Sequence, residues 1–350
     1  MKIAVIAITG NGVRLGAKVR DALAGAELYI PERYAAAAPG GTLYPGELRL
    51  LVARLWPEVN GFVFIMATGI VVRLIAPLLQ AKDRDPAVVV MDESGRFAIS
   101  LLSGHLGGAN ELAGRCALIT GGREVITTAT DVNGLPSFDM VAKGEGWLIE
   151  KLGRVKILNS LLLDGEPIAV VDPTGRVKEL FAGRGRLTFY ETFSEALAGG
   201  AAGFLFVTNR ELLPGERSDR LLLLRPRNLV LGIGCNRGTG EEEIRHVVCS
   251  ALERLSLSLR SVRCVATAEA KRDEPGLNAF AASLGVPLTC YGSSELNQVP
   301  VPSPPSSHAL AAIGATGVAE PAALLASAGG ALLMKKIKSG NMTLAIAEKR

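Results

Sequence analysis

The chain has 350 residues, a formal net charge of +4, 48% hydrophobic residues and 21% charged residues. This length predicts two or three domains, and the hydrophobic content excludes a disordered chain. An aromatic fraction of 5% argues against a stacking platform for single-stranded nucleic acid, and basic residues scattered among acids argue against a nucleic-acid partner. A diffuse positive excess suits an acidic small molecule.

Cysteine usage and hydropathy bear on the compartment. The five cysteines have no C-x-x-C spacing, which indicates free thiols in a reducing compartment. No apolar stretch approaches the ~18 residues of a membrane span. The N-terminal segment MKIAVIAI is predicted to be a strand rather than a signal peptide. We therefore expect a cytoplasmic protein without a membrane partner.

Short apolar runs alternate with helical patterns along the chain, which is typical of βαβ units. The predicted strands are 3–8, 61–65, 87–91, 168–171, 204–207 and 229–233. We expect an α/β fold with two Rossmann-like, parallel-sheet domains joined by a small α/β middle region. The predicted bounds are 1–135, 136–225 and 226–350.

One glycine pattern occurs twice, each time after a predicted strand. The two sets are Gly10, Gly12 and Gly16, and Gly232, Gly234 and Gly238. Both read G-x-G-x-x-x-G, one residue longer than the dinucleotide fingerprint, so a plain strand–turn–helix unit is favoured over dinucleotide binding. The repeat predicts a second α/β domain that begins near Asn228, after the linker RPR.

Two features of the last third are readable. Thr239 and Glu242 have capping-box spacing, and the apolar residues that follow predict a helix. Residues 298–307 contain four prolines and predict an extended loop, for which a connector is favoured over a mobile cover.

Proton-handling residues gather between 65 and 131. His105 and Glu111 stand on a predicted loop that feeds a helix, beside open backbone N–H donors. A lone histidine is usually structural, but the small neighbours of His105 favour a proton carrier. For Glu111, a plain first-turn acid and a partner of His105 are evenly balanced.

Further polar residues predict ligand contacts. Thr127, Thr128, Thr130 and Asp131 end a predicted strand at what would be the carboxyl edge of a parallel sheet, where ligands gather. The cations Arg73, Lys82, Arg84 and Arg237 would together suit a polycarboxylate, although for Arg73 or Lys82 taken alone a plain surface position is favoured. Cys235 is better explained as a packed thiol than as a nucleophile.

Four segments carry a family resemblance. In order they are TGIVVRLIAP, KDRDPAVVVMDE, LLSGHLGGANEL and TTATD, and together they resemble the N-terminal module of the cobalt-precorrin 5A hydrolase (CbiG) family of cobalamin biosynthesis. The resemblance returns in LVLGIGCNRGT at 229–239, at Lys271 with Asp273 and Glu274, and in GVAEPAA at 317–323.

The resemblance implies an activity. Enzymes of this family open the lactone of cobalt-precorrin 5A with water and release acetaldehyde, giving cobalt-precorrin 5B. It implies an anionic cobalt-bearing tetrapyrrole as substrate, with the cobalt carried by the substrate, no other cofactor and no protein metal site. The C-terminal part resembles a separate protein of the aerobic route, which implies macrocycle binding. A non-catalytic corrinoid carrier is the alternative. A homodimer and transient contacts with pathway enzymes both stay open.

We assign catalytic and substrate-binding roles to individual residues as hypotheses. His105 is assigned as the general base, Glu111 as its orienter or the second proton acceptor, and the N–H groups around Gly107 and Gly108 as oxyanion donors. The residues expected to bind substrate are Thr68, Gly69, Arg73, Lys82, Asp85, Ser103, Gly104, Gly107, Gly108, Asn110, Thr127, Thr128, Asp131, Gly234, Arg237, Thr239 and Lys271.

Overall fold

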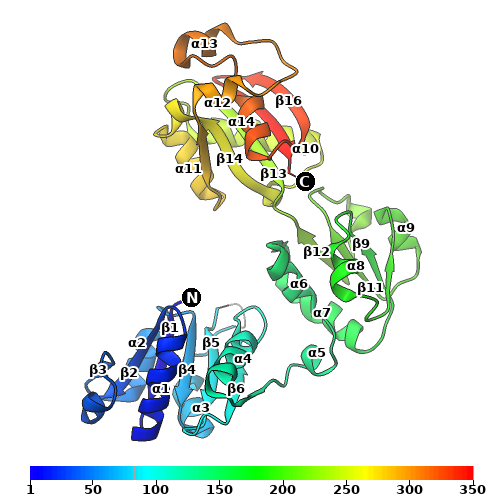
Figure 1. The fold of residues 1–350 in the computed structure, drawn as a ribbon. Coiled ribbons are helices and arrows are strands. Elements are labelled where there is room, and N and C mark those ends of the chain that lie inside the picture. The colour runs from blue at the N-terminus through cyan, green and yellow to red at the C-terminus, as the bar shows by residue number, and fades with distance from the viewer. Residues whose placement is uncertain (82–83, 350) are drawn as a thin grey trace. The chain divides into compact units, whose positions relative to one another are not determined.

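The computed structural model describes residues 1–81 and 84–349, and the chain divides into two compact units, Met1–Met140 and Val141–Arg350 (Figure 1). The first unit contains a seven-stranded sheet, and the second contains two five-stranded sheets. The α/β fold class is thereby confirmed. The finer domain bounds at 135 and 225 stay predictions.

The sheet of the first unit has the strand order β3-β2-β1-β4-β5-β6-β7. Its strands are β1 (Ile3–Ala7), β2 (Ala26–Pro31), β3 (Thr42–Tyr44), β4 (Gly61–Ile65), β5 (Ala87–Met91), β6 (Phe97–Leu102) and β7 (Arg123–Val125). The first five run parallel, whereas β6 is antiparallel to β5 and β7 is parallel to β6. The carboxyl ends of β6 and β7 therefore lie at the edge opposite to those of the other five strands.

Helices cover both faces of this sheet. The helices of this part of the chain are α1 (Gly10–Ala22), η1 (Glu32–Ala37), α2 (Leu48–Leu55), α3 (Thr68–Ile75), η2 (Ala76–Leu78) and α4 (Ala109–Thr120). They are followed by α5 (Ala129–Val132) and by α6 (Phe138–Glu145), which crosses into the second unit. Along β1, Ile3 and Val5 join the core formed with α1 and α4, while Ala4 and Ile6 join the core formed with α2 and α3. Burial on both faces explains why these strands read as continuous apolar runs.

The second unit begins with a sheet of strand order β10-β9-β11-β12-β8. Its elements are β8 (Leu148–Ile149), α7 (Leu152–Leu163), β9 (Ile168–Val171), α8 (Arg176–Phe181), β10 (Leu187–Phe189), α9 (Phe193–Ala198), β11 (Gly203–Val207), η3 (Pro214–Glu216) and β12 (Leu221–Arg225). Only the pairing of β12 with β8 is antiparallel.

The last sheet has the strand order β15-β14-β13-β17-β16. Its elements are β13 (Leu229–Cys235), α10 (Glu241–Arg254), η4 (Leu259–Ser261), β14 (Val262–Ala268), η5 (Glu269–Lys271), α11 (Pro275–Ser283), β15 (Leu288–Tyr291), α12 (Ser293–Asn297), α13 (Ser307–Ile313), α14 (Ala319–Ala326), β16 (Ala331–Ser339) and β17 (Met342–Glu348). β13 pairs in parallel with β14 and antiparallel with β17.

All six predicted strands are present, to within two residues at each end, but the glycine repeat is wrong as a shared turn. The first set lies inside α1, whereas Gly232 and Gly234 lie inside β13. A Cβ at Gly232 would stand 1.9 Å from the carbonyl oxygen of Ala319. Gly232 therefore lets α14 pack directly on the sheet, a role unrelated to a ligand turn.

The predicted capping box is also wrong, although its helix is confirmed. Gly240 is the N-cap of α10, and the Thr239 hydroxyl instead donates to the carbonyl oxygen of Asn236 at 2.9 Å. The apolar face of the helix is buried as expected. The spacing of apolar residues predicted the helix correctly, but the residue at which it begins depends on contacts made in the folded protein.

The proline-rich loop at 298–307 is held by several hydrogen bonds to other segments, among them the bond from the Ser306 N–H to the Thr316 carbonyl oxygen at 2.7 Å. The backbone N–H and hydroxyl of Ser303 donate to the carboxylate of Glu320 at 3.2 and 2.7 Å, and the Lys336 N–H donates to the same carboxylate at 2.8 Å. Glu320 is buried, and its hydrogen bonds satisfy its charge. These bonds support a connector rather than a mobile cover.

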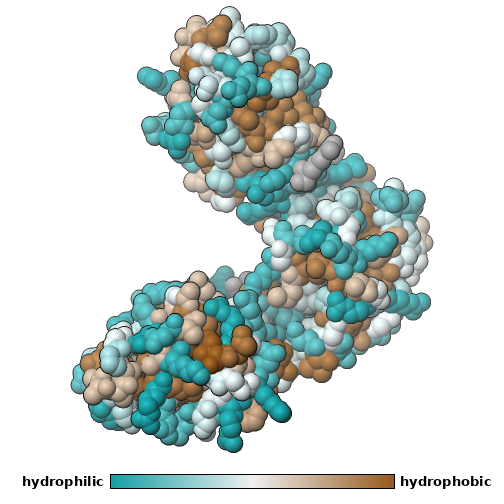
Figure 2. All heavy atoms as spheres, viewed as in Figure 1, coloured by the Kyte–Doolittle hydropathy of each residue, from teal (hydrophilic) through white to brown (hydrophobic). Residues whose placement is uncertain are grey.

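The surface mixes polar and apolar side chains. Figure 2 shows hydrophilic residues over much of the visible face of each part, with apolar patches between them. None of the helices among the described residues has both the length and the apolar composition needed to cross a bilayer.

We expect a fragment that begins at Asn228 to fold alone. It keeps a complete five-stranded sheet with an apolar core on each face, and its size is close to that of a typical domain. Thermal unfolding followed by circular dichroism should be cooperative. Absence of protected amides in hydrogen exchange would contradict the predicted boundary.

Candidate active site

His105 lies on a tight loop between β6 and α4. Ser103 has a positive φ of 57°, and the N–H groups of Ala109 and Asn110 donate back to the carbonyl oxygens of Ser103 and Gly104 at 3.1 and 3.0 Å. A Cβ at Gly107 would come within 2.4 Å of the Ser103 Cβ. The loop therefore requires glycine there, and it holds His105 in one position.

Two carboxylates flank the imidazole of His105. Its Nε2 lies 2.8 Å from Oδ2 of Asp131, and its Nδ1 lies 3.2 Å from Oδ2 of Asp139. Thr130 Oγ1 is 3.2 Å from Nε2. The side chains of His105 and Asp139 are 16% and 8% exposed, whereas that of Asp131 is 42% exposed. One carboxylate is thus a buried anchor, and the other faces solvent and any ligand.

A layer of amide and hydroxyl groups positions Asp131. Asn110 Nδ2 donates to Asp131 Oδ2 at 3.1 Å and to Thr128 Oγ1 at 3.2 Å. The Ser100 hydroxyl donates to Asn110 Oδ1 at 2.6 Å. A Cβ at Gly104 would lie 2.6 Å from that Oδ1, so Gly104 also makes room for the amide. Such supporting bonds hold a reactive pair in a fixed geometry.

The carboxylates control the protonation of His105. The hydrogen bond with Asp139 is the largest influence and raises the pKa of His105 above its ordinary value. The hydrogen bond with Asp131 acts in the same direction, while burial opposes both. The imidazolium form is therefore favoured over a wider pH range than for a free histidine.

The strand directions bring together part of the predicted site. Ser103, His105 and Asn110 follow β6, and Thr128 and Asp131 follow β7. We expected the threonine cluster at the edge where most parallel strands end. That expectation is wrong, because β6 and β7 run opposite to β1, β4 and β5.

Other predicted residues lie elsewhere in the first unit. Thr68 and Gly69 begin α3 at the opposite edge of the sheet, and Arg73 Nη1 donates to the Gly69 carbonyl oxygen at 2.9 Å. Lys82 is outside the described residues. The Asp85 carboxylate accepts the N–H of Gln80, which is a structural role.

Two catalytic assignments need correction. Glu111 is exposed in the first turn of α4, the position of a plain first-turn acid rather than of a buried partner for the imidazole. The N–H of Gly108 donates to the carbonyl oxygen of His105 at 3.0 Å, so it is unavailable as an oxyanion donor. Thr127 is exposed at the end of β7.

Sequence reasoning missed Asp139. It stands eight positions after Asp131, in the first turn of α6, and its burial comes from tertiary contacts. An acid beside Phe138 at a helix start was the available signal, but a first-turn acid is common for electrostatic reasons alone. Nothing local could pair it with His105.

The remaining predicted residues lie in the second unit. Arg237 is exposed, and Lys271 Nζ is 3.2 Å from Oε2 of Glu274, whose Oε1 accepts the Gly238 N–H at 2.5 Å. Gly234 is packed against Thr343 and Val318. This turn is held by an internal ion pair.

The fold and site define a multidomain α/β protein with an imidazole held between carboxylates, and comparisons identify its family. Profiles for the cobalamin synthesis G N-terminal, central and C-terminal regions match residues 50–131, 136–226 and 229–347. The chain belongs to the cobalamin synthesis G (CbiG) family.

Relatives resemble the chain along its length. A cobalt-precorrin-5A hydrolase of Priestia megaterium is 35% identical, covering 98% of this chain and 94% of the relative. One of Salmonella typhimurium is 30% identical, covering 98% and 97%. Protein CobE of Sinorhizobium sp. is 36% identical over 34% of this chain and 79% of its own length.

We predict that Asp139→Asn lowers the pKa of His105, because it removes the neighbouring negative charge and the hydrogen bond that contributes most to raising this pKa. Proton NMR titration of the imidazole C2–H measures it, with His246 and His308 as internal references. An unchanged titration of His105 would contradict the assigned pair.

A second prediction concerns stability. Since the pKa of His105 is higher in the folded state, its ion pairs stabilise the fold fully below about pH 6.5 and lose this effect as pH rises through the folded-state pKa. The free energy of unfolding of the natural chain should exceed that of His105→Gln by more at about pH 6 than at about pH 9. Denaturant unfolding measures both, and an equal difference at the two pH values would overturn the prediction.

Proposed function

We propose that this protein is a cobalt-precorrin-5A hydrolase, which adds water to the lactone of its substrate and releases acetaldehyde. The observation that carries the proposal is full-length similarity to two proteins of that name, at 35% and 30% identity over 98% of the chain. The imidazole–carboxylate arrangement adds a site suited to proton transfer.

The first step needs a base. Neutral His105 takes a proton from water as the water oxygen bonds to the lactone carbonyl carbon, and Asp131 and Asp139 stabilise the imidazolium that forms. Cleavage of the acyl–oxygen bond expels an alkoxide, which takes the proton back from the His105 imidazolium and becomes a hydroxyl group, while the new carboxylic acid loses its proton to water and becomes a carboxylate. The N–H of Gly107 is the remaining candidate donor to the tetrahedral oxyanion.

The second step breaks a carbon–carbon bond. Removal of the proton from the new hydroxyl lets its oxygen form the carbonyl of acetaldehyde, while the bonding electron pair passes to the macrocycle and is protonated there. Asp131 is placed to accept the hydroxyl proton, since it is exposed and bonded to His105. The cobalt belongs to the substrate, and the proposal requires no cofactor.

The substrate is an anionic tetrapyrrole, so cations should surround the site. Arg73 and Lys82 stay predictions in this respect. The five cysteines form no disulfide, which fits the reducing cytoplasm where we place the enzyme.

A corrinoid carrier is the second candidate. Binding alone needs cations but gives no reason for an imidazole between two carboxylates. Incubation of purified protein with cobalt-precorrin 5A and an assay for acetaldehyde separates the two. If acetaldehyde is released no faster with the protein than from the substrate alone, the carrier is favoured.

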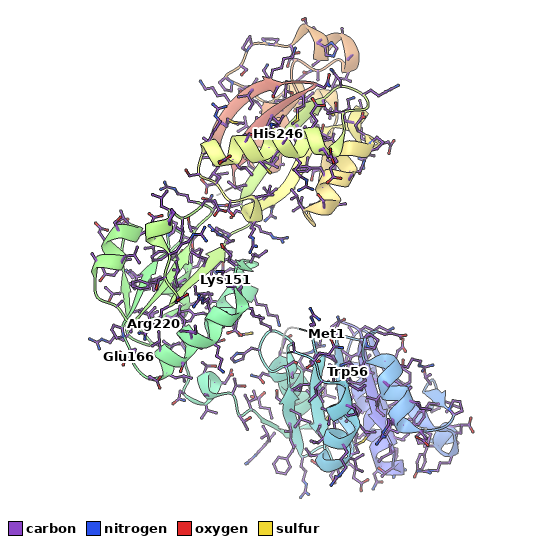
Figure 3. The ribbon with its side chains drawn as sticks, turned by 180° about the vertical axis from the view of Figure 1, so that it is seen from behind. Met1, Trp56, Lys151, Glu166, Arg220 and His246 are labelled. Atoms are coloured by element: carbon purple, nitrogen blue, oxygen red, sulfur yellow. The ribbon has the colours of Figure 1, made fainter. Side chains whose placement is uncertain are left out.

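We predict that His105→Ala lowers acetaldehyde release by at least ~100-fold and changes corrinoid binding by less than about tenfold, because a positioned acid or base typically contributes 10² to 10⁴ in rate. His246→Ala is the matched control, since His246 is exposed on α10 (Figure 3) and should keep normal turnover. Near-normal release by His105→Ala would contradict the assignment.

The pH dependence gives a separate test. As a general base, His105 must be neutral, so kcat/KM should rise with pH through a pKa above about 6.5. Asp139→Asn should move this rise to lower pH. A profile that falls over the same range would instead identify the imidazolium as a general acid.

A further inference from the structure

We propose that a groove in the second unit binds the carboxylate-bearing tetrapyrrole, at a place separate from the predicted ligand residues. The groove has a volume of about 720 Å³, within the ~300–1,000 Å³ of typical small-molecule sites. Its walls come from the ends of α6 and α8, the linker after β12, and strands β14 and β15. The ligand class rests on the proposed function, whereas the groove itself does not.

Positive charge dominates the groove. Arg227, Arg263 and Lys349 line it, and none of the three makes an ion pair among residues 1–81 and 84–349. Arg176, the fourth cation, is neutralised by Glu145 at 2.8 Å. Three uncompensated cations along one groove suit a ligand with several carboxylates spread around its edge.

Glu348 does not neutralise the cations of the groove. Glu348, next to Lys349 in sequence, accepts hydrogen bonds from Asn209 Nδ2 at 2.7 Å and Asn228 Nδ2 at 2.8 Å. Its charge is therefore held by amides rather than by the groove cations. The positive potential stays available to a ligand.

Flat side chains line the same groove as the cations. Trp147 and Tyr291 line the groove together with Pro287, and burial is the main cause that raises the pKa of Tyr291. Aromatic faces offer large contact area to a flat conjugated ring at low entropic cost. Cations beside aromatic surface match a tetrapyrrole, with its apolar ring and charged rim, better than they match a free phosphate.

The groove is held in shape before any ligand binds. β8 pairs antiparallel with β12, with Leu148 opposite Arg225, so Trp147 stands close to the linker residue Pro226. Arg225 is fully buried and lies 2.8 Å from the Glu150 carboxylate. Backbone bonds from Ser258 to Asn209 at 2.7 Å and from Glu211 to Ser256 at 2.8 Å join the two sheets. A preformed site loses less entropy on binding.

The experiment uses the full chain and cobyrinic acid, a cobalt corrinoid with free carboxylates, in equilibrium dialysis at low salt. Arg263→Glu and Lys349→Glu should each raise the Kd for cobyrinic acid at least about tenfold. Added salt should reduce the difference in Kd between each variant and the natural chain. Arg254→Glu, an exposed arginine at the end of α10, is the matched control and should change Kd less than about twofold.

The aromatic contact has its own variant. Trp147→Leu should weaken binding while leaving the dependence of Kd on salt unchanged, because it removes contact area and no charge. Circular dichroism melts check folding, and the double variant Arg263→Gln with Lys349→Gln replaces any charge reversal that fails to fold. Unchanged Kd in the folded groove variants, or no binding of cobyrinic acid by the natural chain, overturns the proposal.

Failure of the groove and failure of the proposed function are distinguishable. Loss of cobyrinic acid affinity in Arg263→Glu, with no acetaldehyde from the natural chain, supports the groove and rejects the hydrolase. If the natural chain releases acetaldehyde and Arg263→Glu has the same Kd and KM, the groove is not the binding site, while the hydrolase activity stands. His105→Ala should retain affinity for cobyrinic acid in either case.

Discussion

The reversal of β6 against β5 is the constraint on which the candidate site depends. The turn between them is built by Asp92, whose carboxylate accepts the N–H groups of Ser94 and Phe97 at 2.9 and 2.8 Å, and by Gly95 with a φ of 69°. After this turn β6 and β7 run together toward the other edge of the sheet. Their ends deliver His105 and Asp131 to one place.

Placing an imidazole between two carboxylates has a chemical consequence. The pair favours the charged form, so fewer molecules hold neutral His105 near neutral pH, but each neutral imidazole is a stronger base. Unequal exposure divides the work: buried Asp139 orients the ring, and exposed Asp131 can meet a ligand. In the proposed mechanism, His105 therefore acts as the base of the first step and Asp131 as the base of the second.

Arginine has two distinct uses in the second unit. Arg225 is buried, with carboxylate and carbonyl partners around its guanidinium, and its loss would leave buried acceptors unpaired. Arg227 and Arg263 line the groove, and neither makes an ion pair with any residue that the structure describes. Arg225 therefore stabilises the fold, whereas Arg227 and Arg263 remain available for a ligand.

The sequence by itself determined the α/β class, the six predicted strands, the helix after residue 240 and the chemical interest of His105, because periodicity and residue size report burial locally. Only the tertiary structure decided that Asp139 pairs with His105, that Glu111 faces solvent and that Gly232 serves helix packing. These outcomes depend on strand direction and on contacts between distant segments. A sheet can run a strand either way with the same apolar pattern, so no local signal carries that information.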